Sequence, residues 1–150
     1  MEISYYEMSY EDIPKISSME AEYFSQPWKE DSIAHYMELG NMLFIVAKDN
    51  SGHSPVIVGY LALLCTADES DLVSIAVREG YRRMGIAREL LDIIYDMARD
   101  RGICHIHLEV REGNAAAIEL YESEGFLYEG KRKGYYEKPR EDALIYTKHI

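Results

Sequence analysis

The sequence has few of the features that mark a secreted or membrane-bound chain. It contains two cysteines, Cys65 and Cys104, and both stand in apolar runs rather than in a spaced framework. No stretch is long and apolar enough to span a bilayer, and the sequence contains no recognisable signal peptide. These absences predict a cytoplasmic protein that keeps its thiols reduced and does not bind a membrane.

Basic residues are also scarce. Sixteen Lys and Arg stand against 27 Asp and Glu, so the formal net charge is −11. A nucleic-acid surface needs a net basic face, and we therefore expect no direct contact with nucleic acid. The acidic balance instead favours a cationic substrate. His, Cys and carboxylate residues do not recur at metal-ligand spacing, which predicts no metal site.

The hydrophobic content of 47% over 150 residues suits one domain with a sizeable core. No linker, internal repeat or low-complexity run interrupts the chain, so we expect residues 1–150 to form a single domain. Alternating and helical apolar patterns follow one another, which predicts an α/β (α+β) fold. At the N-terminal end we expect a strand at residues 3–5, a helix whose buried side carries Ile13, Ile16, Tyr23 and Phe24, and a second helix ending at Gly40. A hairpin should follow over residues 42–65. At the C-terminal end we expect a strand at residues 126–131, a loop holding residues 134–139, and a last strand at residues 143–148.

The stretch from Leu72 to Arg101 contains a candidate anion site. An apolar run is followed by a turn with two glycines, and from Ile86 onward apolar side chains recur at the helical period. Four arginines crowd the start of this helix: Arg78, Arg82, Arg83 and Arg88. The partial positive charge of a helix N-terminus should repel them, whereas an anion held by the first N–H groups would pair with them. A phosphate ligand is therefore predicted, and a solvated basic turn is the alternative.

Two familiar phosphate motifs fail on the same residues. Gly80 and Gly85 have P-loop spacing, but Ile86 and Ala87 follow where that loop needs Lys and Ser or Thr. No third glycine completes a dinucleotide-binding turn. The pattern Arg82-x-x-Gly85-x-Ala87 instead resembles the coenzyme A pyrophosphate loop of the GNAT acyltransferases, which reads Gln/Arg-x-x-Gly-x-Gly/Ala.

A second candidate site residue follows this helix. Residues 104–110 alternate, with Cys104, Ile106, Leu108 and Val110 on one face and His105, His107 and Glu109 on the other. A strand after a strand and a helix is most simply the second parallel strand of a right-handed crossover. That arrangement brings Glu109 near the anion loop. The pattern alone is equally compatible with a solvated carboxylate, and it favours ordinary polar-face positions for the two histidines.

Three further residues have both a structural and a functional interpretation. Asn114 is a good N-cap for a short helix that ends at Gly125. Tyr121 lies on the apolar stripe of that helix, where a core tyrosine explains it as well as a catalytic one does. Trp28 follows Pro27 on a loop between two helices, which suits either a packing anchor or a substrate contact.

Longer runs carry a closer resemblance within the GNAT family, to the bacterial ribosomal-protein alanine N-acetyltransferases of the RimI group. The matching runs are Leu108-Glu109-Val110-Arg111, Asn114-Ala115-Ala116-Ala117-Ile118, Leu120-Tyr121-Glu122, Gly125-Phe126, Gln26-Pro27-Trp28, Ser74-Ile75-Ala76-Val77, Tyr135-Tyr136 and Arg140-Glu141-Asp142-Ala143. The departures are Ser74 in place of a frequent Asn, Gly113 in place of the usual Ser, and Lys29 after the Pro-Trp pair.

The resemblance implies a GNAT fold with a single mixed central sheet of about six to seven strands, flanked by about four helices. It also implies acetyl-CoA as co-substrate, without a metal. Main-chain groups of one strand would hold the pantetheine arm like an added strand, and the loop amides would hold the pyrophosphate. The implied coenzyme-binding residues are Ile75, Ala76, Val77, Arg82, Arg83, Met84, Gly85, Ile86, Ala87, Arg88 and Asn114.

The same resemblance implies the catalytic roles. Glu109 would act as the base, directly or through a water, and Tyr121 would return a proton to the departing thiolate. Trp28, Tyr135 and Tyr136 would contact the acceptor. The implied acceptor is the N-terminal α-amine of a protein beginning with alanine, from the small ribosomal subunit. The alternatives are acetylation of a small amine or a lysine, and a coenzyme-binding or sensing subunit without catalysis.

Overall fold

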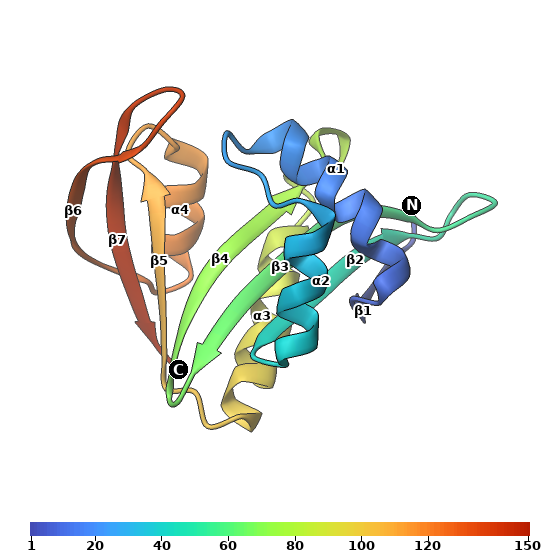
Figure 1. Ribbon diagram of the computed structural model, residues 1–150, viewed down its shortest axis with the longest axis horizontal. Helices are drawn as coiled ribbons and strands as arrows, with labels where there is room; N and C mark the ends of the chain where they lie inside the picture. The colour runs from blue at the N-terminus through green and yellow to red at the C-terminus, as the bar shows by residue number, and fades with distance from the viewer.

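A single mixed sheet of seven strands runs through the structure, a computed structural model that describes residues 1–150. The strand order is β1-β2-β3-β4-β5-β7-β6 (Figure 1). With four α-helices, it confirms the expected architecture. The strands are β1 (Ile3–Glu7), β2 (Met42–Asp49), β3 (Val56–Thr66), β4 (Glu69–Val77), β5 (His105–Arg111), β6 (Leu127–Tyr136) and β7 (Glu141–His149). The helices are α1 (Ile13–Tyr23), α2 (Glu30–Leu39), α3 (Ile86–Asp100) and α4 (Ala115–Ser123).

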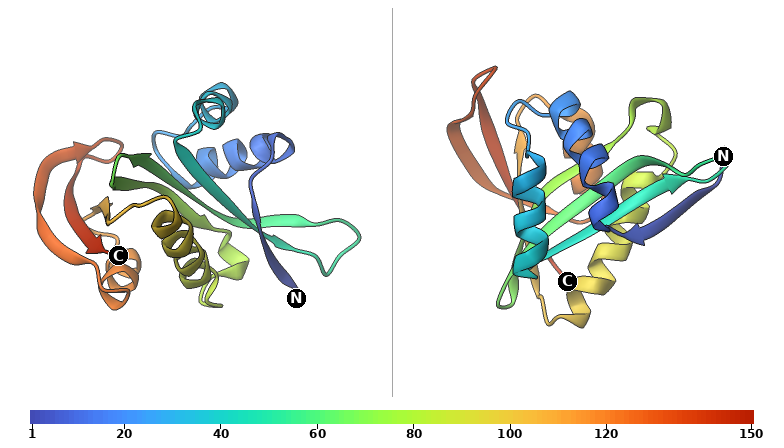
Figure 2. Two further views of the ribbon diagram at one scale, coloured as in Figure 1. Left: turned by 90° about the horizontal axis from the view of Figure 1, so that it is seen from below. Right: turned by 45° about the vertical axis from the view of Figure 1, so that its right-hand side comes forward.

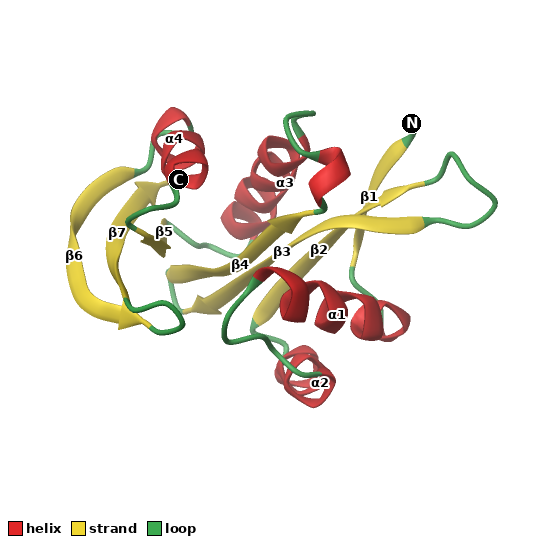
Figure 3. Ribbon diagram, turned by 90° about the horizontal axis from the view of Figure 1, so that it is seen from above, coloured by secondary structure: helices red, strands yellow, loops and turns green.

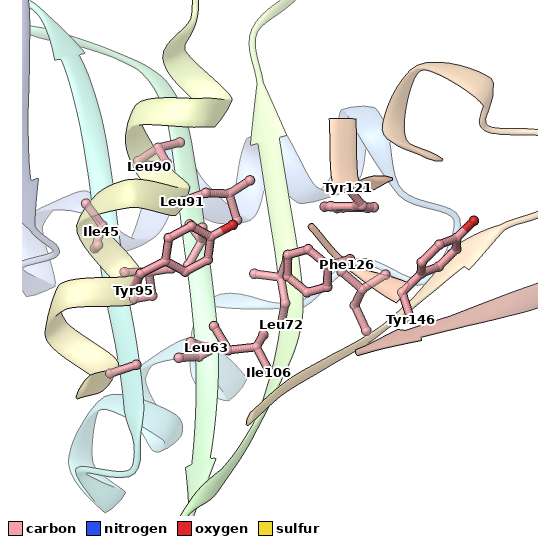
Figure 4. Close-up of a cluster of buried hydrophobic side chains, with 14 of the residues drawn as sticks. Ile45, Leu63, Leu72, Leu90, Leu91, Tyr95, Ile106, Tyr121, Phe126 and Tyr146 are labelled. Atoms are coloured by element: carbon pink, nitrogen blue, oxygen red, sulfur yellow. The ribbon is translucent and has the colours of Figure 1, made fainter. Parts of the chain in front are cut away.

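Helices cover both faces of the sheet. Helices α1 and α2 lie on one face, and α3 and α4 lie on the other (Figures 2 and 3). The apolar stripe of α3 packs into the larger of two cores, which also holds Tyr121 and Phe126 (Figure 4). The smaller core lies under α1 and α2 and contains Ile16 and Ile33. The periodic apolar positions of α2 and α3 thus face the sheet as the sequence predicts.

The junction between β4 and β5 positions the candidate site. The two strands pair in parallel over only three positions, from Glu69 with His105 to Asp71 with His107. They then diverge toward their carboxyl ends (Figure 1). From Leu72 onward β4 pairs only with β3, and from Leu108 onward β5 pairs only with β7. Main-chain groups on the facing edges of β4 and β5 therefore have no strand partner at this end of the sheet.

Two bulges adjust the strands around this junction. In β3 the register shifts beside Gly59, and glycine inside a strand is typical of such a bulge. A side chain at Gly59 would meet the Ala76 carbonyl at 3.1 Å and the Ile86 side chain at 3.3 Å, so the glycine lets α3 approach the sheet closely. In β4 the register shift leaves Val73 without a partner and 40% exposed. This second bulge redirects the carboxyl end of β4.

Three details of the sequence-based prediction are wrong. Helix α1 ends at Tyr23, so Phe24 is extended and 37% exposed, while Met19 is buried in its place. Cys104 lies outside β5 and is exposed. Residues 134–136 belong to β6 rather than to a loop, because pairing with β7 continues as far as Tyr136 opposite Glu141.

Candidate active site

The turn between β4 and α3 has the geometry of an anion-binding loop. Gly85, the N-cap of α3, has a φ of 81°, and Arg83 has a φ of 63°, so the chain turns sharply before Ile86. Such positive φ values favour glycine and make the Arg83 backbone strained. The N–H groups of the first turn of α3 have no partner within the helix. They face the loop with the positive end of the helix dipole behind them, which suits phosphate.

Of the four arginines around this loop, only one is unengaged. Arg78 and Arg82 donate to main-chain carbonyl oxygens of β3 and β4 at 3.3 and 3.0 Å. Arg88 pairs with Glu124 at 2.9 Å and thereby joins the first turn of α3 to the end of α4. Arg83 is exposed and forms no hydrogen bond or ion pair within the protein. Its guanidinium is therefore the one most readily available to a ligand.

The edge of β4 continues the same site toward β5. Ile75, Ala76 and Val77 pair with β3 on one side and have no strand partner on the other. All three are half-buried. An unpaired edge of this kind can bind an extended ligand through main-chain hydrogen bonds, as an added strand would.

Helix α4 begins on the other side of the divergence. Asn114 is its N-cap, and its Oδ1 accepts a hydrogen bond from the Ala117 N–H at 3.2 Å. This cap leaves the side-chain NH₂ group of Asn114 free to donate. The expected N-cap is thus present at the end of β5, across from the open edge of β4.

Tyr121 on α4 is buried, but its hydroxyl has no partner. The ring packs against Phe126 in a T-shaped contact with centroids 5.6 Å apart (Figure 4). The hydroxyl forms no hydrogen bond within the protein, yet its oxygen is not sealed from solvent. Burial raises the pKa of Tyr121, with a smaller contribution from Tyr136. The hydroxyl therefore stays protonated at neutral pH and can donate a proton.

Glu109 lies on the polar face of β5, where its side chain is 28% exposed. The Nη2 atom of Arg132, on β6, stands 3.7 Å from its Oε1. Burial raises the pKa of Tyr136 to about 12, and the charge of Glu109 adds to this shift. Tyr136 is thus close enough to interact electrostatically with both Glu109 and Tyr121. Glu109 lies on the part of β5 that no longer pairs with β4.

The other predicted acceptor contacts lie on two segments. The ring of Trp28 packs against Tyr36 and Phe44 at centroid distances of 5.6 and 6.2 Å, and the side chain remains partly exposed. Tyr135 is 47% exposed on β6, and its ring stands perpendicular to that of Tyr136 at 5.0 Å.

A buried acidic side chain that the sequence-based prediction did not include lies under the Trp28 loop. Glu20 on α1 is 3% exposed and accepts hydrogen bonds from the Tyr60 hydroxyl, from Ser74 Oγ at 2.6 Å and from the Trp28 N–H at 3.2 Å. Glu20 follows Ile16 by four residues and therefore lies on the apolar stripe of α1. An acidic residue at such a position is the sequence feature that could have indicated a buried carboxyl group. The network also accounts for Ser74, because its hydroxyl supplies one of the donors.

The histidines of β5 lie at the opposite end of the strand from the open edge. Glu69 Oε2 is 2.9 Å from His105 Nδ1 and 3.2 Å from His107 Nε2. His105 also packs edge-on against His149 at 4.4 Å. These contacts support the polar-face interpretation. Across the chain, no group of three or more His, Cys, Asp or Glu side chains is arranged to hold a metal ion.

Comparisons with known proteins identify the family and the fold. Residues 13–126 match the Acetyltransferase (GNAT) family. The chain is 34% identical over 136 residues to the [ribosomal protein bS18]-alanine N-acetyltransferase of Escherichia coli K12, covering 89% of this chain and 88% of that protein. The crystal structure of the ribosomal-protein-S18-alanine N-acetyltransferase from Escherichia coli has a TM-score of 0.87 and 32% identity, covering 99% of this chain and 94% of that chain. Arabidopsis thaliana NAA60 in complex with acetyl-CoA shares the fold, with a TM-score of 0.88 at 17% identity and coverage of 99% and 98%.

Proposed function

Because this chain belongs to the GNAT acetyltransferase family, we propose that it transfers the acetyl group of acetyl-CoA to the N-terminal α-amine of a ribosomal protein that begins with alanine. The observation that carries the proposal is the open edge of β4 with Glu109 and Tyr121 beside it. The Escherichia coli relative is an alanine N-acetyltransferase of ribosomal protein bS18, and this similarity supports a ribosomal protein as the acceptor.

The coenzyme half of the site is proposed from the groups that lack partners. Main-chain groups of Ile75, Ala76 and Val77 would hydrogen-bond the pantetheine arm. Arg83 and the N–H groups from Gly85 onward would hold the pyrophosphate. The free NH₂ group of Asn114 would contact the coenzyme near its thioester. The rest of the coenzyme-binding loop consists of Arg82, Met84, Ile86, Ala87 and Arg88. Arg82 and Arg88 would mainly hold the loop in position through their contacts with Val77 and Glu124.

The chemical step needs one base and one acid. Acetyl-CoA supplies a thioester carbon that a neutral amine can attack. Glu109 would take a proton from the acceptor ammonium, directly or through a water, which frees the nitrogen lone pair. As the C–N bond forms and the C–S bond breaks, Tyr121 would give its proton to the sulfur and regain one from the nitrogen. One proton leaves through Glu109 in each turnover.

An α-amine suits this site better than a lysine. At pH about 7.4 an α-amine of pKa about 7.8 is roughly a quarter neutral, whereas a lysine of pKa about 10.4 is neutral about once in a thousand molecules. For lysine the site would have to offset roughly 3.5 kcal/mol more, which calls for desolvation or a stronger base than one carboxylate. The first acceptor residues would contact Trp28, Tyr135 and Tyr136, and the net charge of −11 favours a basic chain.

Paired peptides test the proposal. Acetylation is followed by mass spectrometry, and thiol release from acetyl-CoA by absorbance. An alanine-first peptide without lysine should be acetylated faster than its partner with a blocked N-terminus and one internal lysine. A faster reaction of the blocked peptide would favour lysine acetylation instead. Absence of thiol release with every acceptor would favour a coenzyme-binding subunit without catalysis.

A further inference from the structure

One side chain that the proposed chemistry does not use, that of Arg111, bridges two segments of the chain that are distant in sequence. Arg111 is the last residue of β5. Glu109 precedes it by two positions, so both side chains lie on the same face of the strand. Its guanidinium contacts the β6–β7 turn and the segment between α1 and α2. These two segments approach each other across the site in Figure 1.

The contacts with the β6–β7 turn involve four groups. Nη1 of Arg111 donates to the Pro139 carbonyl at 2.9 Å and to Glu141 Oε1 at 3.1 Å, and Nη2 donates to the Glu137 carbonyl at 3.0 Å. The guanidinium carbon also lies 4.4 Å from the centre of the Tyr136 ring. The ion pair is half-buried, with the side chains of Arg111 and Glu141 23% and 25% exposed. Solvent therefore screens it less than a surface pair.

The contact with the α1–α2 segment runs through Ser25. Nη2 of Arg111 donates to Ser25 Oγ at 3.0 Å, and Ser25 Oγ in turn donates to the Glu137 carbonyl at 3.2 Å. Residues 24–29 and 137–140 share no other hydrogen bond or ion pair. Ser25 lies three residues before Trp28, so this link holds the start of the segment, while Glu20 and Ser17 hold its end through the Trp28 main chain.

We propose that Arg111 is a positioning residue for the acceptor, because it holds the α1–α2 segment and the β6–β7 turn at a fixed separation around Glu109. The inference rests on the proposed acetyl transfer. Guanidinium chemistry is essential to the role, since a planar group with five N–H donors can serve four acceptors and stack on a ring at once. An ammonium group cannot reproduce this arrangement.

Trp28 is the only tryptophan of the chain, so its fluorescence reports the order of the α1–α2 segment without any activity assay. Arg111→Met keeps the apolar stem and removes the contacts. We expect it to increase acrylamide quenching of Trp28 and to raise KM for the N-terminal peptide roughly tenfold, which is about 1.4 kcal/mol. The Kd for acetyl-CoA should not change. Arg111→Lys should show the same raised quenching, because it restores the charge but not the contacts.

Two controls complete the experiment. Arg99→Met removes an exposed ion pair with Asp96 on α3 and should change neither quenching nor KM. Ser25→Ala breaks only the link to the α1–α2 segment and should increase quenching even if Arg111→Met does not fold. If both Arg111→Met and Ser25→Ala quench like the wild type, the positioning role is wrong. If the wild type acetylates no N-terminal peptide, the proposed function fails, while the quenching result still decides the role of Arg111.

Discussion

Ser74 on β4 donates a hydrogen bond of 2.6 Å to the carboxylate of Glu20 on α1, 54 residues away in the chain. Through this contact the strand proposed to bind acetyl-CoA is tied to the helix beneath the Trp28 loop. The same side chain accepts from the Tyr60 hydroxyl and from the Trp28 N–H, so this buried acceptor has three donors. Burying a polar side chain costs free energy unless it is hydrogen-bonded, so loss of these donors would destabilise the folded protein.

The first prediction concerns the stability that Glu20 provides. Glu20→Ala leaves the Tyr60 and Ser74 hydroxyls without their buried acceptor, and it should lower the free energy of unfolding by about 3 kcal/mol. Urea unfolding measures the change. Glu22→Ala, at an exposed position of the same helix, should stay within about 0.5 kcal/mol of the wild type. Equal effects at both positions would show that the network contributes little.

The second prediction concerns the coenzyme loop. Arg83→Glu places a negative charge where the phosphates of acetyl-CoA should bind, and it should raise the Kd at least about tenfold. Calorimetry gives the affinity. Arg99→Glu makes the same change of charge in the last turn of α3, away from the loop, and serves as the matched control. Unchanged affinity in Arg83→Glu would contradict the assignment of the loop.

The third prediction concerns Glu109 as the base. Glu109→Gln should lower kcat at neutral pH by about a hundredfold and leave the affinity for acetyl-CoA nearly intact. The loss should shrink as the pH rises through about 7.8, because the α-amine is then already neutral. The exposed Glu112 provides the control variant Glu112→Gln. A constant loss across the pH range would mean that Glu109 does not act as the base.

The fourth prediction concerns Tyr121. Tyr121→Phe removes a hydroxyl without a partner in the protein, so the melting temperature should not fall, whereas kcat should fall roughly tenfold. Burial raises the pKa of Tyr121, so the wild-type hydroxyl should remain a donor up to pH about 10. Tyr10→Phe, at a 57% exposed position, should change neither quantity. Wild-type turnover in Tyr121→Phe would assign the ring to the core alone.

Local pattern alone predicts much of this protein. The apolar period of α3 and the glycines that bound it, Gly85 and Gly102, are visible in the sequence because backbone sterics and side-chain direction act over one or two turns. The Asn114 cap and the polar face that carries Glu109 follow from the same short-range rules. The order of strand, loop, helix and strand then predicts the parallel pairing that places them at one edge.

Tertiary structure decides which groups meet. The sequence does not distinguish Arg83, which is free, from Arg88, which pairs with a residue 36 positions away. It also does not show that Arg111 and Ser25, separated by 86 residues, join the α1–α2 segment to the β6–β7 turn. Periodicity reports which side of an element faces the core, but hydrogen bonds between distant elements depend on strand register, bulges and the divergence of β4 from β5. Strand register, bulges and strand divergence produce no periodic pattern that could be recognised in the sequence.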